Sequence, residues 1–390
     1  MKGRINLNKQ YKNYLLRFLR CLFSFLSEYV PIRKNRIVCY SFNGEQYSCS
    51  PKAISEYLEK NYPEKFEIIW AFRKNTPIEK NKMLNKFTVV PYNSLRFLYY
   101  YASAKFIITN IYPYQLLKTK SGQIVIDTWH GGGAYKVAGL DQNKNQNSKQ
   151  MIKAMEFNSE NISLFISSSR MFTKHFIRNG LRFKGKVLKT GLQRNDIFFL
   201  SPEEKEKIKQ KTFRKIGLEK NTHFCLYAPT WKYDEKYPFV FNAETLSKAL
   251  EQRFGGKWVI VTRMHHLSKN KINGNVIDAS NYPDMQELLL SADFLISDYS
   301  SAIWDYSLTH KPCLLYTYDL KNYLDKRSMY IDIKKWGFPL CETFDELINA
   351  VITFDEADFV ERMKYHYNLM GGYDKGNACK QLAGFILRQI

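Results

Sequence analysis

The amino-acid sequence predicts an α/β protein made of two doubly wound, Rossmann-like domains that face each other across a cleft. Short apolar runs of strand length alternate with helix-like segments. Many of these runs are apolar throughout, as in a parallel sheet that helices cover on both faces. A polar and charged stretch after Asn195 interrupts the alternation, which then starts again. With 390 residues, of which 45% are hydrophobic, the chain is long enough for two domains with their own cores.

Residues 1–35 are predicted to form a basic amphipathic segment. Residues 1–36 contain nine Lys or Arg and a single acidic residue, Glu28. Leu15, Leu19, Leu22 and Leu26 fall on one helical face. A helix of this kind suits the surface of an anionic membrane, and packing against the protein's own core is the alternative. The segment is too short and too charged to cross a bilayer, and no signal-peptide cleavage site follows it.

Residues 36–200 are predicted to form the first domain. Seven apolar runs are the expected strands: 36–42, 66–72, 87–92, 105–110, 123–128, 164–168 and 186–191. Helix-like segments lie between them, for example at 51–60 and 93–103. We expect the polar stretch 201–211 to be a linker that leads into the second domain.

Residues 201–375 are predicted to form the second domain, and 376–390 a C-terminal helix. The expected strands are 224–228, 258–262, 276–278, 294–296 and 312–316. Helices are expected at 243–253, after Pro283, after Ser300-Ser301 and at 357–367. Because open α/β sheets bind ligands at the carboxyl ends of their strands, the residues that follow these strands are the candidates for a site.

Charge and cysteine content narrow the classes of function. The net charge of +22 suits an anionic partner, either nucleic acid, acidic lipid or a phosphorylated substrate. Nucleic acid is disfavoured because the aromatic residues lie mostly in predicted strands and no recognition motif is present. The seven cysteines form no C-x-x-C pair, which argues against a disulfide framework and a zinc site. No obligatory metal is expected, although Mg²⁺ on a pyrophosphate is compatible with the sequence.

A histidine followed by three glycines comes directly after the expected strand 123–128, in Trp129-His130-Gly131-Gly132-Gly133-Ala134-Tyr135-Lys136. The ordinary pKa of a histidine lies near neutrality, so His130 suits a general base on an acceptor hydroxyl. A lone histidine is more often structural, which is the alternative. The glycines leave backbone N–H groups open to a phosphate or oxyanion.

A second basic motif, Thr262-Arg263-Met264-His265-His266, follows the expected strand 258–262. Arg263 and His265 are two residues apart, so on extended chain they face the same way. Together they suit a pyrophosphate, with His265 protonating the departing phosphate. An exposed basic loop is the alternative. A metal site of His265 and His266 is disfavoured because adjacent side chains point apart.

Further candidates follow other strands. Ser300 and Ser301 fall at a helix N-terminus, where free N–H groups and the helix dipole favour an anion, so we expect a phosphate site there. Thr230, after strand 224–228, suits a hydrogen bond to phosphate. Arg194 either reaches the donor phosphate or only pins the hinge between the domains. Glu287 either accepts hydrogen bonds from a ribose diol or lies on the surface.

These motifs resemble those of the CDP-glycerol glycerophosphotransferases, the teichoic acid primases and polymerases of Gram-positive bacteria. The matching segments, in family order, are His130-Gly131 with Lys136, Gly191-Leu192-Gln193-Arg194-Asn195-Asp196, Tyr227-Ala228-Pro229-Thr230-Trp231-Lys232, Arg263-Met264-His265, Asp298-Tyr299-Ser300-Ser301 with Asp305, and Lys326-Arg327-Ser328-Met329-Tyr330-Ile331-Asp332. The sequence departs from the family pattern at Gly132-Gly133, where the family has Thr-Pro, and at Gln193 and His266, where it has proline.

The resemblance implies a GT-B architecture and a CDP-glycerol donor, with CDP-ribitol as a close relative. The acceptor would be an undecaprenyl-linked saccharide or a growing teichoic or capsular polymer, and CMP would leave. His130 would be the base. Gly131, Lys136, Asp298 and Arg327 join the substrate-binding candidates.

The basic amphipathic segment and the unpaired cysteines, which indicate a reducing compartment, predict peripheral attachment to the cytoplasmic face of a bacterial cell membrane. The rival interpretations are a GT-B glycosyltransferase that uses a nucleotide sugar, and an inactive membrane-bound scaffold.

Overall fold

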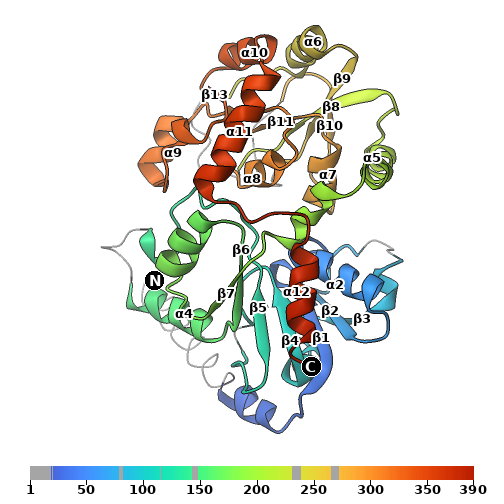
Figure 1. The fold of residues 1–390 in the computed structure, drawn as a ribbon, viewed down its shortest axis with the longest axis vertical. Coiled ribbons are helices and arrows are strands. Elements are labelled where there is room, and N and C mark those ends of the chain that lie inside the picture. Colours follow the sequence, from blue (N-terminus) through green and yellow to red (C-terminus); the bar gives the residue numbers. More distant parts are fainter. Residues whose placement is uncertain are drawn as a thin grey trace, which may run out of the picture.

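Two parallel sheets, each covered by helices, form the two domains of the protein (Figure 1). The structure is a computed structural model that describes residues 19, 21–78, 82–114, 116–142, 148–230, 239–264 and 272–390. The predicted α/β class with two doubly wound domains is confirmed.

The first domain contains a seven-stranded sheet in the order β3-β2-β1-β4-β5-β6-β7, and all neighbouring strands are parallel. Its strands are Arg33–Tyr40 (β1), Glu67–Phe72 (β2), Thr88–Pro91 (β3), Ala104–Thr109 (β4), Ile124–Asp127 (β5), Leu164–Ser167 (β6) and Lys186–Lys189 (β7). All seven expected strands are confirmed. The helices are Cys49–Asn61 (α2), Leu95–Ser103 (α3), Lys149–Glu160 (α4) and the π-helix Phe172–Gly180, and the 3-10 helix Gln193–Phe199 follows β7.

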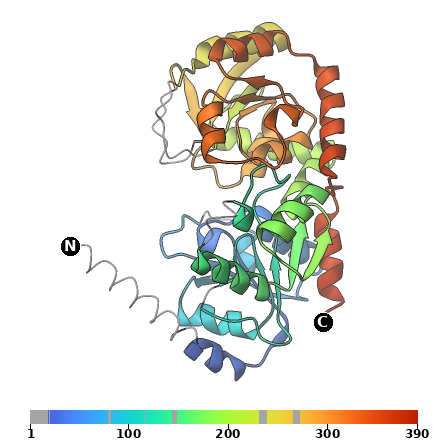
Figure 2. The same ribbon diagram turned by 90° about the vertical axis from the view of Figure 1, so that its left-hand side faces the viewer.

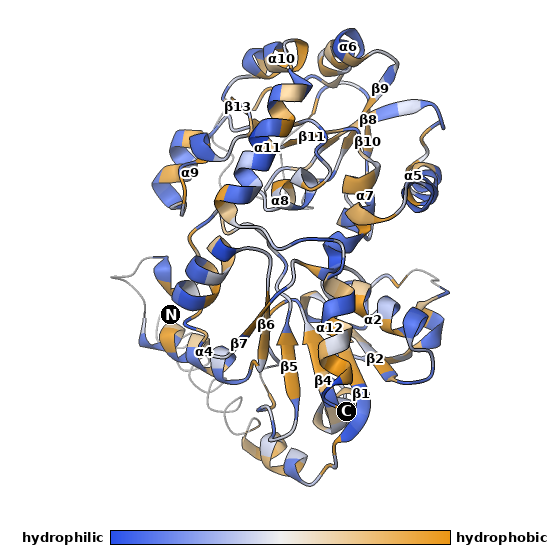
Figure 3. Ribbon diagram, in the orientation of Figure 1, coloured by the Kyte–Doolittle hydropathy of each residue, from blue (hydrophilic) through white to orange (hydrophobic). Residues whose placement is uncertain are grey.

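The second sheet has the order β10-β9-β8-β11-β12-β13 and is also parallel. Its strands are Thr222–Tyr227 (β8), Lys257–Thr262 (β9), Val276–Asp278 (β10), Phe294–Ser297 (β11), Cys313–Tyr316 (β12) and Leu340–Cys341 (β13). The helices are Pro202–Ile216 (α5), Ala243–Phe254 (α6), Met285–Ser291 (α7), Ala302–Ser307 (α8), Leu320–Lys326 (α9), Phe344–Ile352 (α10) and Glu356–Met370 (α11). In both domains the strands are the apolar interior and the outer helices carry the polar residues (Figure 3).

The chain returns to the first domain at its C-terminal end. Helix α12 (Ala378–Leu387) follows α11 along one side of the molecule (Figure 2). Leu382 and Ile386 of α12 are buried in the same cluster as Ile37 and Trp70 of the first sheet. The last helix therefore completes the core of the domain in which the chain began.

The expected linker at 201–211 is wrong, because this stretch forms most of helix α5. Ser201 caps the helix in a capping box with Glu204, and Pro202 occupies its first turn. Phe213, near the other end, is buried in the core of the second domain. The helix was missed because almost all of its surface is polar, as its colouring in Figure 3 shows.

The predicted N-terminal amphipathic segment lies mostly outside the described residues, which omit 1–18 and 20. Residues 21–28 are helical. Leu22, Phe25, Leu26 and Tyr29 are between 40% and 74% exposed. In the described part of the chain, no helix has the length and apolar character to cross a membrane.

Candidate active site

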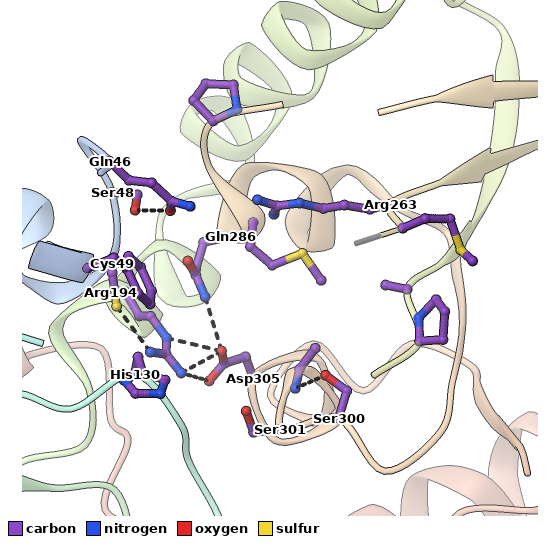
Figure 4. Close-up of a pocket in the computed structure, with 17 residues that line it drawn as sticks. Gln46, Ser48, Cys49, His130, Arg194, Arg263, Gln286, Ser300, Ser301 and Asp305 are labelled. Carbon is purple, nitrogen blue, oxygen red and sulfur yellow. Dashed lines mark hydrogen bonds and ion pairs between the residues drawn. The ribbon is translucent and has the colours of Figure 1, made fainter. Parts of the chain in front are cut away.

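A pocket of about 420 Å³ lies where the carboxyl ends of the two sheets meet (Figure 4). In each sheet, the strands that come next in the chain are added first on one side of the first strand and later on its other side. The direction of winding therefore reverses between β1 and β4 and between β8 and β11. Such reversal points are where doubly wound sheets bind ligands. The lining residues follow β1, β5, β7, β8, β9, β10 and β11: Phe42, Gln46, Ser48, Cys49, His130, Arg194, Ala228, Pro229, Arg263, Met264, Pro283, Met285, Gln286, Ser300, Ser301, Ala302 and Asp305.

His130 is held in one tautomer at the edge of this pocket. Its Nδ1 lies 2.8 Å from the backbone oxygen of Asn110, at the end of β4. A carbonyl oxygen only accepts hydrogen bonds, so Nδ1 carries the proton and Nε2 keeps its lone pair. Burial lowers the pKa of His130 to about 4, and the charges of Arg194 and Lys136 act in the same direction. The side chain is therefore neutral at physiological pH and has the protonation state that a base requires.

The glycines after His130 make room for the second domain. A Cβ atom on Gly132 would lie 2.1 Å from Cδ1 of the buried Trp304 of α8, and Gly133 has a φ of +77°. A Cβ on Gly131 would approach Oγ of Ser301 to 3.4 Å. The sequence predicts that these glycines open the backbone to a ligand. At Gly132 the structure shows a packing reason instead.

The segment that follows the glycines is embedded in the second domain. The Tyr135 hydroxyl lies 2.7 Å from Nε2 of His366, and both side chains are buried. The N–H of Val137 donates to the oxygen of Ser328, and Lys136 pairs with Met329 as an isolated bridge. Burial lowers the pKa of Lys136, while the charge of Asp298 opposes this shift. The loop from His130 to Val137 therefore links the two domains.

Arg194 forms a buried ion pair across the domain boundary. Its guanidinium donates from Nε to Oδ2 of Asp305 at 3.1 Å and from Nη2 to Oδ1 at 3.2 Å. Nε2 of Gln286 donates to the same carboxylate at 3.0 Å, and Nη1 of Arg194 contacts Sγ of Cys49 at 3.2 Å. The Asp305 charge helps to raise the pKa of Arg194. These contacts agree with the hinge interpretation of Arg194, although its side chain also lines the pocket (Figure 4).

Arg263 and the two serines face the pocket from the second domain. The N–H of Arg263 donates to the oxygen of Tyr227 at 2.9 Å, which fixes the backbone directly after β9. Its Nη1 is buried and has no hydrogen-bond partner among the described residues. Burial lowers the pKa of Arg263, so an anion in the pocket would stabilise its charge. The hydroxyl of Ser300 accepts a hydrogen bond from Ala302 N–H at 3.3 Å.

The sequence profile of the CDP-Glycerol:Poly(glycerophosphate) glycerophosphotransferase family matches residues 22–388. The chain belongs to this family. Transfer of glycerol phosphate from CDP-glycerol, the predicted class of activity, is the reaction for which the family is named. The resemblance inferred from the motifs is thus confirmed.

Individual members of the glycerophosphotransferase family match over nearly the whole chain. A teichoic acid glycerol-phosphate transferase of Staphylococcus aureus is 30% identical, over 91% of this chain and 93% of its own length. A teichoic acid poly(glycerol phosphate) polymerase of Bacillus spizizenii is 28% identical, over 99% of this chain and 100% of its own length. The chain spans about half the length of two further polymerases that it matches, 45% and 53%.

The wall teichoic acid polymerase TagF is a structural match, with a TM-score of 0.81 and 26% identity over 100% of this chain and 98% of that chain. A structure of a TagF variant soaked with CDPG matches with a TM-score of 0.80 and 25% identity. The fold of this glycerophosphotransferase is therefore that of TagF.

Other residues that the motifs singled out lie away from the main pocket or outside the described chain. Glu287 is buried and lines a neighbouring pocket, where it accepts hydrogen bonds from Lys211 and Tyr282, each at 2.7 Å. It is therefore not a surface glutamate. Arg327 is exposed at the end of α9. His265 lies outside the described residues.

Thr230 and Asp298 are linked to each other. The N–H of Thr230 donates to Oδ1 of Asp298 at 2.7 Å, so this carboxylate fixes the turn after β8. Asp298 is almost fully buried. Neither residue lines the main pocket. Their contact fixes the turn that carries Pro229, which lines the pocket. Direct contact of Thr230 or Asp298 with substrate stays a prediction.

The sequence motifs did not assign roles to Asp305, Gln286, Cys49 or Asn110. Asp305 was part of the family motif, and that was the one available signal. Asn110 and Cys49 carry no signal in the sequence, because each contacts a residue that is distant along the chain but belongs to the same domain. Gln286 is assigned only through its hydrogen bond to Asp305. Within the described residues, no group of three or more His, Cys, Asp or Glu side chains is arranged to hold a metal ion. Metal dependence stays a prediction.

Proposed function

We propose that this protein transfers glycerol phosphate from CDP-glycerol to a hydroxyl of an undecaprenyl-linked saccharide or of a teichoic or capsular polymer, and releases CMP. The observation that carries the proposal is His130, whose Nε2 has the lone pair of a base, in a pocket that it shares with Arg263, Ser300 and Ser301. Family membership and the likeness to TagF support the CDP-glycerol donor.

In the proposed reaction, Nε2 of His130 takes the proton of the acceptor hydroxyl. The acceptor oxygen attacks the phosphorus that bears the glycerol, and the bond from this phosphorus to the bridging oxygen breaks. CMP leaves with that oxygen and its electron pair. This is an in-line phosphoryl transfer, in which positioning and charge stabilisation supply most of the catalysis.

We assign the stabilisation of the negative charge on the pyrophosphate to residues of the second domain. Arg263 has a buried N–H group without a partner in the described part of the chain, and Ser300 and Ser301 add hydroxyl donors. A guanidinium is well suited to phosphate because its N–H groups form a planar fork. His265, assigned from the sequence alone, would protonate the departing CMP.

The deciding experiment measures CMP release from CDP-glycerol and from CDP-ribitol, with a membrane extract as acceptor. Release that is lost in His130→Ala supports the proposal and shows which polyol is used. His223→Ala is the matched control, because His223 lies at the opposite end of β8 from the pocket. Release of nucleotide only from a nucleotide sugar would overturn the proposal in favour of a glycosyltransferase.

The proposed place of the reaction is the cytoplasmic face of the cell membrane. Two bonds attach the inner side of the helix at 21–28 to the first domain: the N–H of Lys118 donates to Oγ of Ser24, and Nζ of Lys120 donates to the oxygen of Ser27. The exposed side carries Phe25 and Leu26. An apolar surface on a basic segment suits an anionic bilayer.

Vesicle flotation tests this attachment. Phe25→Asp is expected to reduce binding to phosphatidylglycerol vesicles by several-fold, and wild-type binding to phosphatidylcholine vesicles should be weaker. Tyr365→Asp is a matched control, since Tyr365 is 63% exposed on α11 in the other domain. Equal binding of Phe25→Asp and wild type would exclude this surface.

A further inference from the structure

The Arg194–Asp305 ion pair lies on the wall of the proposed active site and joins the two domains. Arg194 belongs to the 3-10 helix after β7, and Asp305 to α8. Both side chains are 4% exposed, and the shortest N–O distance between them is 2.9 Å. Both also line the pocket, together with His130 and Gln286 (Figure 4). The pair is thus shielded from bulk solvent and next to the proposed base.

We propose that Asp305 is a positioning residue of the transfer reaction, which holds the Arg194 guanidinium beside His130 and balances its charge. The proposal rests on the proposed role of His130 as base. Asp305 takes two hydrogen bonds from the guanidinium and one from Gln286, so its orientation is fixed from both sides.

The positive charge of Arg194 has to be balanced because His130 itself becomes positively charged during the reaction. When His130 takes the acceptor proton, its ring becomes a cation beside a second cation. Besides burial, the charge of Arg194 lowers the pKa of His130. Asp305 lies within hydrogen-bond distance of Arg194, so we expect the guanidinium to disfavour the protonated ring more strongly when this carboxylate is removed. Asp305 therefore lowers the free energy of the protonated base in the transition state.

The other charged and titratable groups around this loop do not replace Asp305. Lys136 adds a further positive charge. Burial raises the pKa of both Asp127, which accepts from the N–H of Trp129, and Asp305. The charge of Arg194 opposes this shift at Asp305, whereas only the Trp129 N–H opposes it at Asp127. The thiol of Cys49 contacts Arg194. Among the residues that line the pocket, Asp305 is the one carboxylate, within the described chain.

Stability alone is a weak explanation for the pair. A buried ion pair is often no more stabilising than apolar side chains of the same volume. A partly buried pair serves for comparison: Arg36 is buried and donates from Nε and Nη2 to Glu67 at 2.9 and 3.0 Å, while the Glu67 side chain is 31% exposed. That pair joins β1 and β2, and neither residue lines the pocket.

The experiment compares the steady-state release of CMP from CDP-glycerol by full-length Asp305→Asn, Arg194→Met and the double variant. We expect Asp305→Asn to lower kcat by about tenfold or more, with KM for CDP-glycerol within about twofold of wild type. Adding Arg194→Met should recover part of this loss, because it removes the unbalanced cation. Glu67→Gln is the control and should keep kcat while lowering the melting temperature.

Several outcomes would overturn the proposal. A double variant as slow as Asp305→Asn, or slower, would show a structural role. A raised KM in Arg194→Met would show that Arg194 binds the donor directly. If Asp305→Asn does not fold, Gln286→Leu is the variant to measure. This substitution removes the hydrogen bond from Gln286 to the Asp305 carboxylate without changing any charge. It should lower kcat about threefold and leave KM unchanged. A wild-type kcat in Gln286→Leu would refute the positioning role.

The wild-type protein separates this proposal from the proposed function. If wild type releases no CMP from CDP-glycerol, the proposed function fails. If wild type is active but the double variant is no faster than Asp305→Asn, or Gln286→Leu keeps the wild-type kcat, only the role of Asp305 fails.

Discussion

Substitution of Gly132 by alanine tests whether the glycine loop is shaped by the second domain. The added Cβ would lie 2.1 Å from Cδ1 and 2.7 Å from Cγ of Trp304. Carbon atoms in contact are about 3.5–4.0 Å apart, so the overlap exceeds 1 Å. Trp304 cannot turn away, because it is fully buried and stacks on Tyr367 at a ring distance of 5.6 Å. Either the loop or the domain boundary must move.

The expected cost of Gly132→Ala is about 2–3 kcal/mol, the upper part of the range for overpacked cores. For a domain of roughly 150–250 residues, this loss of stability lowers the melting temperature by roughly 5–10 °C. CMP release should fall as well, because His130 is two residues away. Thermal unfolding by circular dichroism and CMP release are the two measurements.

Gly384→Ala is the control for Gly132→Ala. Gly384 lies inside α12, where a Cβ would meet its nearest neighbour, Nη1 of Arg388, at 3.6 Å. Alanine favours a helix over glycine by about 1 kcal/mol, so this variant should be equally or more stable than wild type. Wild-type stability and activity in Gly132→Ala would refute the packing argument.

Three further predictions concern pH and metal. Burial lowers the pKa of His130 to about 4. The value of kcat/KM should therefore stay level from neutral pH down to about pH 5 and fall as the pH drops through 4. A fall of kcat/KM with a midpoint near pH 6.5, the ordinary pKa of histidine, would contradict this prediction. Burial raises the pKa of Asp374 to about 7, so the folded state holds a proton that the unfolded state releases, and stability falls as pH rises from the ordinary carboxyl range through 7. Asp374→Asn should therefore raise the melting temperature at pH 8 more than at pH 4, and equal changes would refute this assignment. EDTA should leave CMP release intact, and a loss that Mg²⁺ restores would show an obligatory metal.

The strands were predictable because they are buried on both faces. In β4, for example, Phe106, Ile107 and Ile108 are all fully buried, so the run reads as continuously apolar. Helix α5 was not predictable in the same way, because it buries only a narrow stripe. Its capping box, Ser201 with Glu204, was nevertheless readable from the sequence.

The candidate site was predictable where it consists of short motifs that follow strands. His130, Arg263, Ser300 and Ser301 were found in this way, and the structure brings them to one pocket. Contacts that join distant segments gave no such signal. Arg194 and Asp305 are 111 residues apart, and nothing in the spacing of the chain indicates that they pair.

The position of His130 depends on both domains at once. Its ring is fixed by a backbone oxygen of the first domain, at Asn110. The loop that carries it is fixed by the second domain, through Gly132 against Trp304 and through Tyr135 against His366. Since Arg263 and the serines belong to the second domain, the base and the proposed phosphate site share the same support. A base held only by the first sheet would shift relative to the proposed phosphate site if the two domains moved, whereas this loop ties the base to the domain that carries that site.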